Sequence, residues 1–289
     1  MNGVKRGIIN GLIVLAVLAV GLFVLRRGGS TRGAAAETAL EPLTIREMKV
    51  GCADAGILSC AGYTAMIDTG EDDDFEKIDE ALQKEGVEEL DFLLLSHFDK
   101  DHIGAAAELL GRYRVKTVFL PDYEGSGKRY DALINALDSC DDVRRISEYC
   151  VFDWHGVMVE LIPAEGELDI PAGEEIDNDM SLLCRLTLGD YKFLFAGDIQ
   201  TPRIEALLAS GLDMQCSWLK YPAHGRYEDA QRALIEKCAP IYAVVCCSRK
   251  NPMDNATRRL LEDSNIGIFE TTSFDVLTVC NGKSIKISG

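Results

Sequence analysis

Histidine is scarce in this chain, which has four in 289 residues. The ten cysteines include no Cys-x-x-Cys pair, which argues against a zinc ribbon or a thioredoxin-like redox site. Lys and Arg form no run longer than a pair, so the sequence carries no sign of a basic stripe for nucleic acid. We find neither an internal repeat nor a low-complexity block, and therefore no sign of a repeat architecture.

Positive charge is also scarce and unevenly placed. The formal net charge is −17, from 30 Lys and Arg against 47 Asp and Glu. Residues 1–36 hold five of the basic residues and no acid, so 25 basic and 47 acidic residues remain in the rest of the chain. Such a surface repels polyanions, which disfavours extended nucleic-acid binding and aids solubility. With 47% apolar residues, the remainder is long enough for one domain with a full core.

An apolar segment stands near the N-terminus. Its 18 residues, 8–25, would reach about 27 Å as a helix, enough to cross a bilayer. We therefore expect a single membrane anchor in residues 1–27, a Gly-, Ala- and Thr-rich linker in 28–42 and a soluble domain in 43–289. Because a short N-terminus usually stays inside the cell, the domain is expected outside it. The alternative is a signal peptide cleaved after the alanines at 34–36, which would release a secreted protein.

The cysteines fall into two groups. One group lies in apolar, strand-like runs, where a free thiol acts as a small buried hydrophobe; it comprises Cys184, Cys246, Cys247 and Cys280. The second group occupies loops and could form disulfides if the domain faces an oxidising exterior. The candidate pairs are Cys52 with Cys60 and Cys140 with Cys150. The sequence does not assign Cys216 to either group.

Two of the four histidines lie in one heptapeptide, residues 96–102, with the sequence Ser-His-Phe-Asp-Lys-Asp-His. The motif follows a largely apolar run, 90–95, and leads into a helical pattern, so it predicts a strand-to-helix turn. Imidazole and carboxylate together are ligands for zinc, manganese or iron. The motif therefore predicts metal binding by the side chains of His97, Asp99, Asp101 and His102. The competing interpretation is a solvated acidic turn.

Hydrophobic periodicity predicts strands that alternate with helices along the soluble part. We expect strands at 44–50, 63–67, 90–95, 115–120, 157–162, 181–188, 191–196, 216–221, 241–247, 266–270 and 275–280. We expect helices at 74–84, 102–112, 127–138, 201–210, 227–237 and 254–263. This pattern is typical of helices packed outside sheets.

The His-x-Asp-x-Asp-His motif after an apolar strand resembles the signature of the metallo-β-lactamase superfamily. Other segments are similar to the soluble hydrolase domain of ComEC-type DNA-uptake proteins, over about residues 44 to 289. These segments are Val-Gly-Cys-Ala-Asp-Ala (50–55), Met-Ile-Asp-Thr-Gly (66–70), Asn-Asp-Met-Ser-Leu (178–182), Phe-Ala-Gly-Asp-Ile (195–199) and Leu-Lys-Tyr-Pro-Ala-His-Gly (219–225). They resemble the family's VGQGDA, LIDTG, NNxSL, TGD and LKVxHHG motifs.

The resemblance implies an αββα sandwich, preceded here by the N-terminal transmembrane helix, with two divalent metal ions along one edge of the sheets. Zinc is the expected metal and manganese the alternative. His97 and Asp99 would help to hold one ion, and Asp101, His102 and His224 the other. Asp198 would bridge both ions, so that Asp101 and Asp198 are the expected catalytic carboxylates. Two such ions would activate water for attack on a substrate.

Other polar residues have secondary roles by the same resemblance. Asp54 and Asp68 are expected to position the ligands from behind. Asn178 remains open between a ligand, a substrate contact and a plain turn residue. His155 follows Phe-Asp-Trp and precedes Gly, which favours a hairpin turn over a metal site.

The chain also departs from the family pattern. It has Ala223 before His224 where the family has two histidines, no histidine in residues 253–257, and Cys52-Ala53 where Gln-Gly is usual. We therefore carry two hypotheses. The first is a membrane-anchored, metal-dependent hydrolase of phosphoesters, which would be nuclease-like as its relatives are; an alternative to it keeps the metals but acts on an ester or a lactam. The second is a binding or scaffold protein that keeps the fold without activity.

Overall fold

The computed structural model describes residues 40–164, 168 and 176–289. These residues form two sheets. The strand order of the first is β15 (Ile285–Ser288), β14 (Val276–Cys280), β1 (Leu43–Glu47), β2 (Gly56–Cys60), β3 (Tyr63–Ile67), β4 (Glu89–Leu94), β5 (Arg114–Pro121) and β6 (Val143–Ile146). The order of the second is β13 (Gly267–Glu270), β12 (Tyr242–Val245), β11 (Trp218–Lys220), β10 (Tyr191–Phe195), β9 (Leu183–Leu188), β8 (Val157–Ile162) and β7 (Cys150–Trp154).

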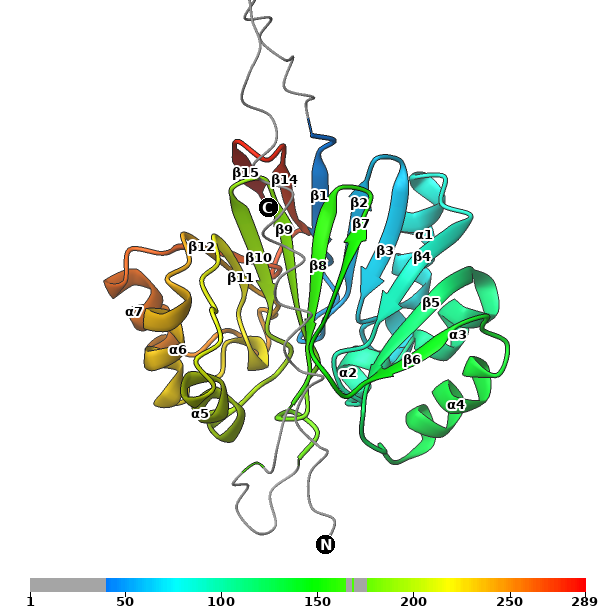
Figure 1. Cartoon of the computed structure of the whole chain (residues 1–289), viewed down its shortest axis with the longest axis horizontal. Coiled ribbons are helices and arrows are strands. Elements are labelled where there is room, and N and C mark those ends of the chain that lie inside the picture. Colours follow the sequence, from blue (N-terminus) through cyan, green and yellow to red (C-terminus); the bar gives the residue numbers. More distant parts are fainter. Residues whose placement is uncertain (1–39, 165–167, 169–175) are drawn as a thin grey trace, which may run out of the picture. The chain divides into compact units, whose positions relative to one another are not determined.

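Helices cover the outer face of each sheet (Figure 1). Against the first sheet lie η1 (Asp72–Asp74), α1 (Phe75–Lys84), α2 (Lys100–Ile103), α3 (Ala106–Arg112) and α4 (Lys128–Leu137). Against the second lie α5 (Thr201–Ala209), α6 (Ala230–Cys238) and α7 (Asn255–Asp263), with the short η2 (Ala223–Gly225) after β11. The inner faces of the two sheets share a third apolar cluster that includes Phe92, Phe193 and Trp218. The expected sandwich of two sheets between helical layers is confirmed.

Parallel pairing brings the chemically important loops to one edge. Strands β3, β4 and β5 are parallel to one another, as are β10, β11 and β12. The carboxyl ends of parallel strands lie at the same edge of a sheet. Asp68, the histidine motif, Asp198 and His224 all follow such ends, so the fold collects them although they are far apart in sequence.

The expected helix at 102–112 is wrong in one respect, because it is two helices. Its break comes at Gly104, whose amide donates to the Gly70 carbonyl at 2.8 Å. A Cβ on Gly104 would lie 2.4 Å from the backbone carbon of Glu71, closer than real atoms approach. The backbone of the histidine loop is thus packed directly on the turn after β3, and this long-range contact overrides local helix periodicity.

Four strands were missed by the periodicity: β2, β6, β7 and β15. Strand β2 joins β3 through a two-residue turn in which both Ala61 and Gly62 have positive φ, 52° and 83°. The other three, β6, β7 and β15, are short and partly exposed, and each is an edge strand of its sheet. Short strands with one solvated face carry a weak apolar signal.

The ten cysteines are all free thiols in the structure. The four expected in strand-like runs are buried as predicted, with Cys246 and Cys247 directly after β12. The conditional pairs, Cys52 with Cys60 and Cys140 with Cys150, are not joined.

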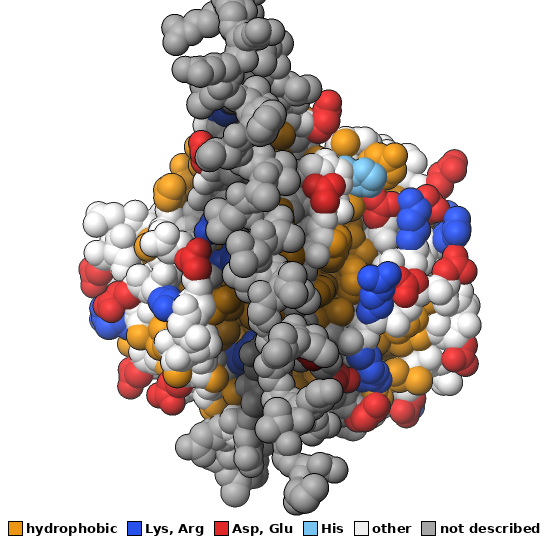
Figure 2. Space-filling model, in the orientation of Figure 1, with side chains coloured by type: hydrophobic (Ala, Val, Ile, Leu, Met, Phe, Trp, Pro, Cys, Tyr) orange, Lys and Arg blue, Asp and Glu red, His pale blue; other side chains and the backbone are white. Residues whose placement is uncertain are grey.

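The expected membrane anchor, residues 8–25, and most of the linker lie outside the described residues. Within 40–164, 168 and 176–289, no helix has the length and apolar character needed to cross a membrane. On the face of the domain seen in Figure 2, acidic side chains are interleaved with Lys and Arg over the flanks, and the described residues show no continuous basic stripe there.

One acidic side chain, Glu47 at the end of β1, is buried at 2% exposure. Its Oε2 accepts a hydrogen bond from the Cys246 thiol at 3.6 Å. Burial, and then the nearby charge of Asp54, raise the pKa of Glu47 to about 8. Glu47 is therefore protonated in the folded protein at neutral pH.

This buried acid gives a testable pH dependence. An unfolded chain would release the Glu47 proton near pH 4.5, whereas the folded chain keeps it to about pH 8. Because the folded state binds the extra proton, wild-type stability should fall with rising pH across this window, by up to about 1.4 kcal/mol per pH unit. Glu47→Gln should remove that slope. Urea denaturation of both proteins between pH 5 and 8 measures it, and parallel slopes would contradict the assignment.

Candidate metal centre

The histidine motif occupies the turn between β4 and α2, as expected. The Asp99 carbonyl accepts hydrogen bonds from the amides of His102 and Ile103, both at 3.0 Å, which starts α2. The four candidate ligands therefore lie on a strand-to-helix turn whose backbone is fixed at both ends. His97 and His102 are fully buried, while the side chains of Asp99 and Asp101 are 34% and 21% exposed.

His102 is oriented by Asp68 from behind. The Nδ1 of His102 lies 2.8 Å from Oδ2 of Asp68. The same carboxylate accepts hydrogen bonds from the amide and the hydroxyl of Ser96, both at 2.7 Å. A carboxylate accepts, so Nδ1 carries a hydrogen, and Nε2 is the nitrogen that would offer its lone pair to a metal ion. Asp68 thus lies where it can orient the imidazole of His102, as its expected positioning role requires.

The other two histidines are held in the same manner. His224 donates from Nδ1 to the Cys246 carbonyl at 3.0 Å. The Nδ1 of His97 lies 3.0 Å from the Ser96 hydroxyl. The Nε2 atoms of His97, His102 and His224 are buried and have no hydrogen-bond partner among the described residues. A buried polar atom without a partner is costly, so three such nitrogens in one place fit a bound metal ion.

Carboxylate oxygens face these free nitrogens. The Oδ2 of Asp198 lies 3.5 Å from Nε2 of His102 and 3.1 Å from Nε2 of His224. Asp101 reaches Nε2 of His224 from the other side, through its Oδ2 at 3.2 Å. Asp198 therefore stands between two of the imidazoles, as a bridging ligand would.

Three-residue groups whose ligand atoms lie within 4.8 Å of one another describe the centre. They are His97 with His102 and Asp198, Asp101 with His102 and His224, Asp54 with Asp198 and His224, and Asp54 with Asp68 and His102. Five of the six expected ligands are thus brought together. The sixth, Asp99, belongs to none of these groups, although its Oδ2 lies 3.6 Å from Nε2 of His97.

The electrostatics of the centre favour a cation. Burial alone would lower the pKa of His102 and of His224, but the surrounding carboxylates, with Asp198 foremost, raise both pKa values well above the ordinary one. Burial alone would raise the pKa of Asp101, but His224 and His102 hold this pKa at about 2. Asp101 and Asp198, whose pKa values are both lowered by the neighbouring cations, are therefore ionised at neutral pH. Protons on the imidazoles or bound metal ions balance their charge.

Lys220, which the sequence analysis did not single out, supplies one fixed positive charge. It is the last residue of β11 and is 2% exposed. Its ammonium forms an ion pair with Asp54, lies 3.3 Å from Oδ1 of Asp198 and donates to the Gly197 carbonyl at 3.1 Å. These contacts leave Oδ2 of Asp198 to the histidines. The lysine lies in the Leu-Lys-Tyr-Pro-Ala-His-Gly motif. Its charge at the end of an apolar strand is the feature of the sequence that could have predicted a buried ion pair here.

Asp54 lies on the far side of the imidazoles from their free nitrogens. Its oxygens are 3.6 Å from Nδ1 of His224 and 3.7 Å from Nδ1 of His102. Together with the Lys220 ion pair, this geometry fits the expected positioning role better than direct ligation.

Asn178 acts through its backbone. Its carbonyl accepts a hydrogen bond from the Ser181 hydroxyl at 2.7 Å, and that hydroxyl accepts from the Asp198 amide at 3.2 Å. The side-chain Oδ1 of Asn178 is buried and has no hydrogen-bond partner among the described residues. Ser181, which the sequence analysis left unnamed, therefore connects Asn178 to the Asp198 loop.

His155 lies apart from this centre. It occupies the β7–β8 hairpin turn with φ 51°, as predicted, stacks on Tyr63 at 3.4 Å and contacts Asp91 through Nε2 at 2.8 Å. Its imidazole thus joins the two sheets at a hairpin.

The segment that lacks the family's late histidine has a structural use. The carboxylate of Asp254 accepts the Tyr227 amide at 3.0 Å, and the Asp254 amide donates to the Gly225 carbonyl at 3.0 Å. These bonds brace the loop after His224. In that loop Ala223 and His224 both have positive φ, 48° and 51°.

Two known proteins resemble part of this chain in sequence. ComE operon protein 3 of Bacillus subtilis is 22% identical over 182 residues, which are 63% of this chain and 23% of that protein. Recombination protein 2 of Haemophilus influenzae is 24% identical over 171 residues, 59% of this chain and 19% of that protein. The chain thus spans less than a quarter of the length of either relative. The expected ComEC-like resemblance is confirmed.

Solved structures share the fold. Igni18, a metallo hydrolase from Ignicoccus hospitalis, has a TM-score of 0.53 at 12% identity, over 82% of this chain and 98% of that one. YhfI, a metallo-beta-lactamase fold protein from Bacillus subtilis, has a TM-score of 0.51 at 10% identity, over 86% and 100%. The diiron β-hydroxylase CmlA from Streptomyces venezuelae has a TM-score of 0.52 at 13% identity, over 84% and 54%.

The family model of the metallo-beta-lactamase superfamily matches residues 60–249, which include the histidine motif, Asp198 and His224. This match covers more than half of the chain. The chain therefore belongs to the metallo-beta-lactamase superfamily.

Proposed function

We propose that this protein is a metal-dependent hydrolase that acts on phosphoesters. The observation that carries the proposal is the convergence of buried imidazole Nε2 atoms and carboxylates: Nε2 of His102 and His224 face the oxygens of Asp198 and Asp101 at 3.1 to 3.5 Å, and His97 joins the same group. An inactive binding protein would gain nothing from so costly a cluster. Zinc, or manganese in its place, suits this mixture of imidazole and carboxylate.

The residues of the chain would divide the work as follows. His97, His102, His224, Asp101 and Asp198 would hold two divalent ions, which when bound supply an activated water and offset the charge that develops on the substrate. Asp68 and the Cys246 carbonyl hold two of the imidazoles in the tautomer that leaves Nε2 free. Asp101, partly exposed and ionised, can accept a hydrogen bond from a water and orient it toward phosphorus. The water oxygen forms a new bond to phosphorus and releases its proton to solvent. The phosphorus–oxygen bond to the leaving group breaks, and the leaving oxygen takes a proton from solvent.

The first test is metal content. We expect two divalent ions per wild-type chain by elemental analysis, and a rise in melting temperature with added zinc or manganese, since binding only to the folded state stabilises it. Asp101→Ala and His102→Ala should lose one ion and the hydrolysis of bis(p-nitrophenyl) phosphate. His155→Ala is the control and should keep both ions, the hydrolysis and the rise in melting temperature with added metal, although its metal-free melting temperature falls with the loss of the Tyr63 stack. If the wild type copurifies without metal and its melting temperature ignores both metals, the scaffold hypothesis replaces this one.

The second test concerns Lys220. Lys220→Met keeps the length of the side chain but leaves Asp54 buried without its ion pair. Breaking a buried pair by removing one partner typically costs about 3–5 kcal/mol, so the chelator-treated variant should unfold at lower urea concentration than wild type. Lys220→Met with Asp54→Asn should recover part of this loss. Equal stability of the single variant and wild type would contradict the ion pair.

The third test concerns the membrane. We propose that residues 8–25 tether the hydrolase to a membrane, with the domain outside the cell. The expressed full chain should stay in the membrane pellet after alkaline carbonate extraction, because its apolar segment is long enough to span a bilayer. A soluble protein whose N-terminus begins at Glu37 would instead establish secretion after cleavage.

A further inference from the structure

The hydroxyl of Tyr123 connects the histidine motif to the loop before β9. Tyr123 follows β5, which pairs in parallel with β4, so the residues after these two strands lie side by side. The Tyr123 hydroxyl accepts a hydrogen bond from the Phe98 amide at 3.0 Å. Phe98 stands between His97 and Asp99 in the motif. The bond therefore fixes the backbone at the point from which both of these side chains leave.

The same hydroxyl reaches a residue that precedes the second sheet's strand β9. It donates a hydrogen bond to the Asp177 carboxylate. Burial, followed by the charge of Asp177, raises the pKa of Tyr123 well above its ordinary value. The phenol therefore keeps its proton at neutral pH, and it uses both its donor and its acceptor capacity.

Asp177 belongs to the turn that supports the Asp198 loop. Its neighbour Asn178 accepts the Ser181 hydroxyl at its carbonyl, at 2.7 Å. The Ser181 hydroxyl in turn accepts the Asp198 amide at 3.2 Å. Tyr123 is therefore connected through this turn to the loop of the carboxylate that is expected to bridge two ions.

Tyr123 is itself held in place. Its carbonyl accepts a hydrogen bond from Nη1 of Arg145 at 2.6 Å, and its ring packs on Phe98 with the centroids 4.7 Å apart. Tyr130 on α4 packs on the Phe98 ring in a similar manner, at 4.8 Å, but its hydroxyl donates to Glu124. The two tyrosines thus share the apolar contact, and of the two only Tyr123 bonds to the backbone of the histidine motif.

We propose that Tyr123 is a positioning residue of the metal centre. Its hydroxyl fixes the part of the motif that presents His97 and Asp99 relative to the loop that presents Asp198. This inference rests on the proposed metal-dependent hydrolase and adds a residue to its machinery. The Phe98 bond holds the Asp99 backbone where Oδ2 lies 3.6 Å from Nε2 of His97. Mutation of residues that orient metal ligands typically costs about 10- to 100-fold in metal affinity or activity.

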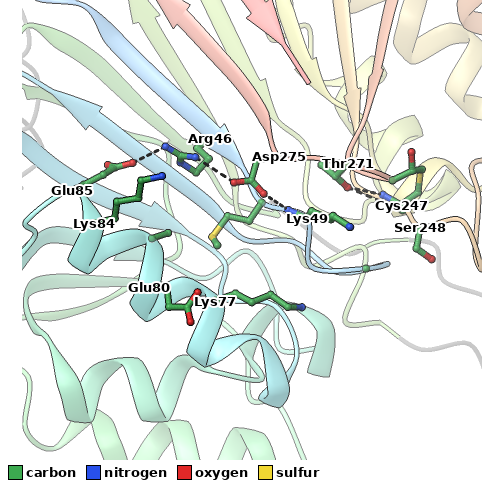
Figure 3. A pocket seen from close by; sticks show the side chains of 14 residues that line it. Arg46, Lys49, Lys77, Glu80, Lys84, Glu85, Cys247, Ser248, Thr271 and Asp275 are labelled. Carbon is green, nitrogen blue, oxygen red and sulfur yellow. Dashed lines mark hydrogen bonds and ion pairs between the residues drawn. The ribbon is translucent and has the colours of Figure 1, made fainter.

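The open approach to the centre does not pass Tyr123. A cavity of about 610 Å³ lies between α1 and the segments after β12 and β13 (Figure 3), and it adjoins one of about 480 Å³ that reaches Asp101. Among the described residues, the linings of these two cavities include neither Tyr123 nor Phe98 nor Asp177. Loss of the Tyr123 hydroxyl should therefore leave substrate access, and with it KM, unchanged. Its effect should fall on metal affinity and on kcat.

Hydrogen–deuterium exchange of the metal-free full chain tests the bond itself. Tyr123→Phe keeps the ring but removes the acceptor of the Phe98 amide, so peptides that span residues 96–102 should contain one amide that exchanges about three- to tenfold faster. Tyr130→Phe is the matched control, because it also keeps its ring on Phe98, and these peptides should exchange as in wild type. Equal exchange in Tyr123→Phe and wild type would overturn the proposal.

Zinc affinity, measured by competition with a chelating indicator, tests the positioning role. Tyr123→Phe should bind zinc about tenfold or more weakly than wild type, and it should hydrolyse bis(p-nitrophenyl) phosphate with a lower kcat at the same KM. Asp177→Asn retains an acceptor for the phenol and should behave as wild type, whereas Asp177→Ala should share the loss. Unchanged zinc affinity in Tyr123→Phe would leave the residue with a structural role alone and overturn the proposal.

The outcomes distinguish this proposal from the proposed function. If the wild type binds zinc but does not hydrolyse the phosphodiester, the proposed function fails, and the zinc affinities still decide the role of Tyr123. If the wild type hydrolyses it and Tyr123→Phe matches it in zinc affinity and kcat, the proposed function stands and the positioning role falls. A wild type that binds neither zinc nor manganese overturns both.

Discussion

The surplus of buried negative charge at one edge of the sandwich is the constraint on which the site depends. Asp54, Asp68 and Asp198 are each no more than 6% exposed, and Asp101 stands just outside them. Lys220 is the one Lys or Arg that forms an ion pair with any of these four carboxylates among the described residues. Burying carboxylates without compensation is prohibitively costly, so the remaining charge must come from protonated imidazoles or from metal ions.

Because of this constraint, the surrounding residues make hydrogen bonds to Nδ1 of the imidazoles, the ring nitrogen that faces away from the carboxylates of Asp101 and Asp198. Asp68 holds both Ser96 and His102, and the Cys246 carbonyl holds His224. Each bond fixes an imidazole with its free nitrogen toward the carboxylates. The Gly104 contact with the turn after β3 then fixes the loop that carries two of these imidazoles, since no larger residue could approach the Glu71 backbone so closely.

The sequence predicted the parts of the site that are local. The histidine motif needs only seven consecutive residues, and its place after an apolar strand followed from periodicity. The roles of three residues, Lys220, Ser96 and Ser181, were not predicted. Their contacts connect residues 17 to 166 positions apart, and a single sequence does not reveal such neighbours. The Lys220 pair with Asp54, for example, joins β11 of one sheet to the loop after β1 of the other. The missed strands β2, β6, β7 and β15 are likewise defined by their partners more than by their own apolar pattern.

Ala223 shows how a departure from a family pattern can be absorbed. Both Ala223 and His224 have positive φ, a conformation that costs a residue with a Cβ roughly 1 kcal/mol or more. The turn keeps it because Gly225 and Asp254 exchange a backbone bond below it and Cys246 holds the imidazole above it. With Ala223 beside it, the single imidazole of His224 reaches both Asp101 and Asp198. The geometry of the turn, and not the number of histidines in it, decides which carboxylates His224 meets.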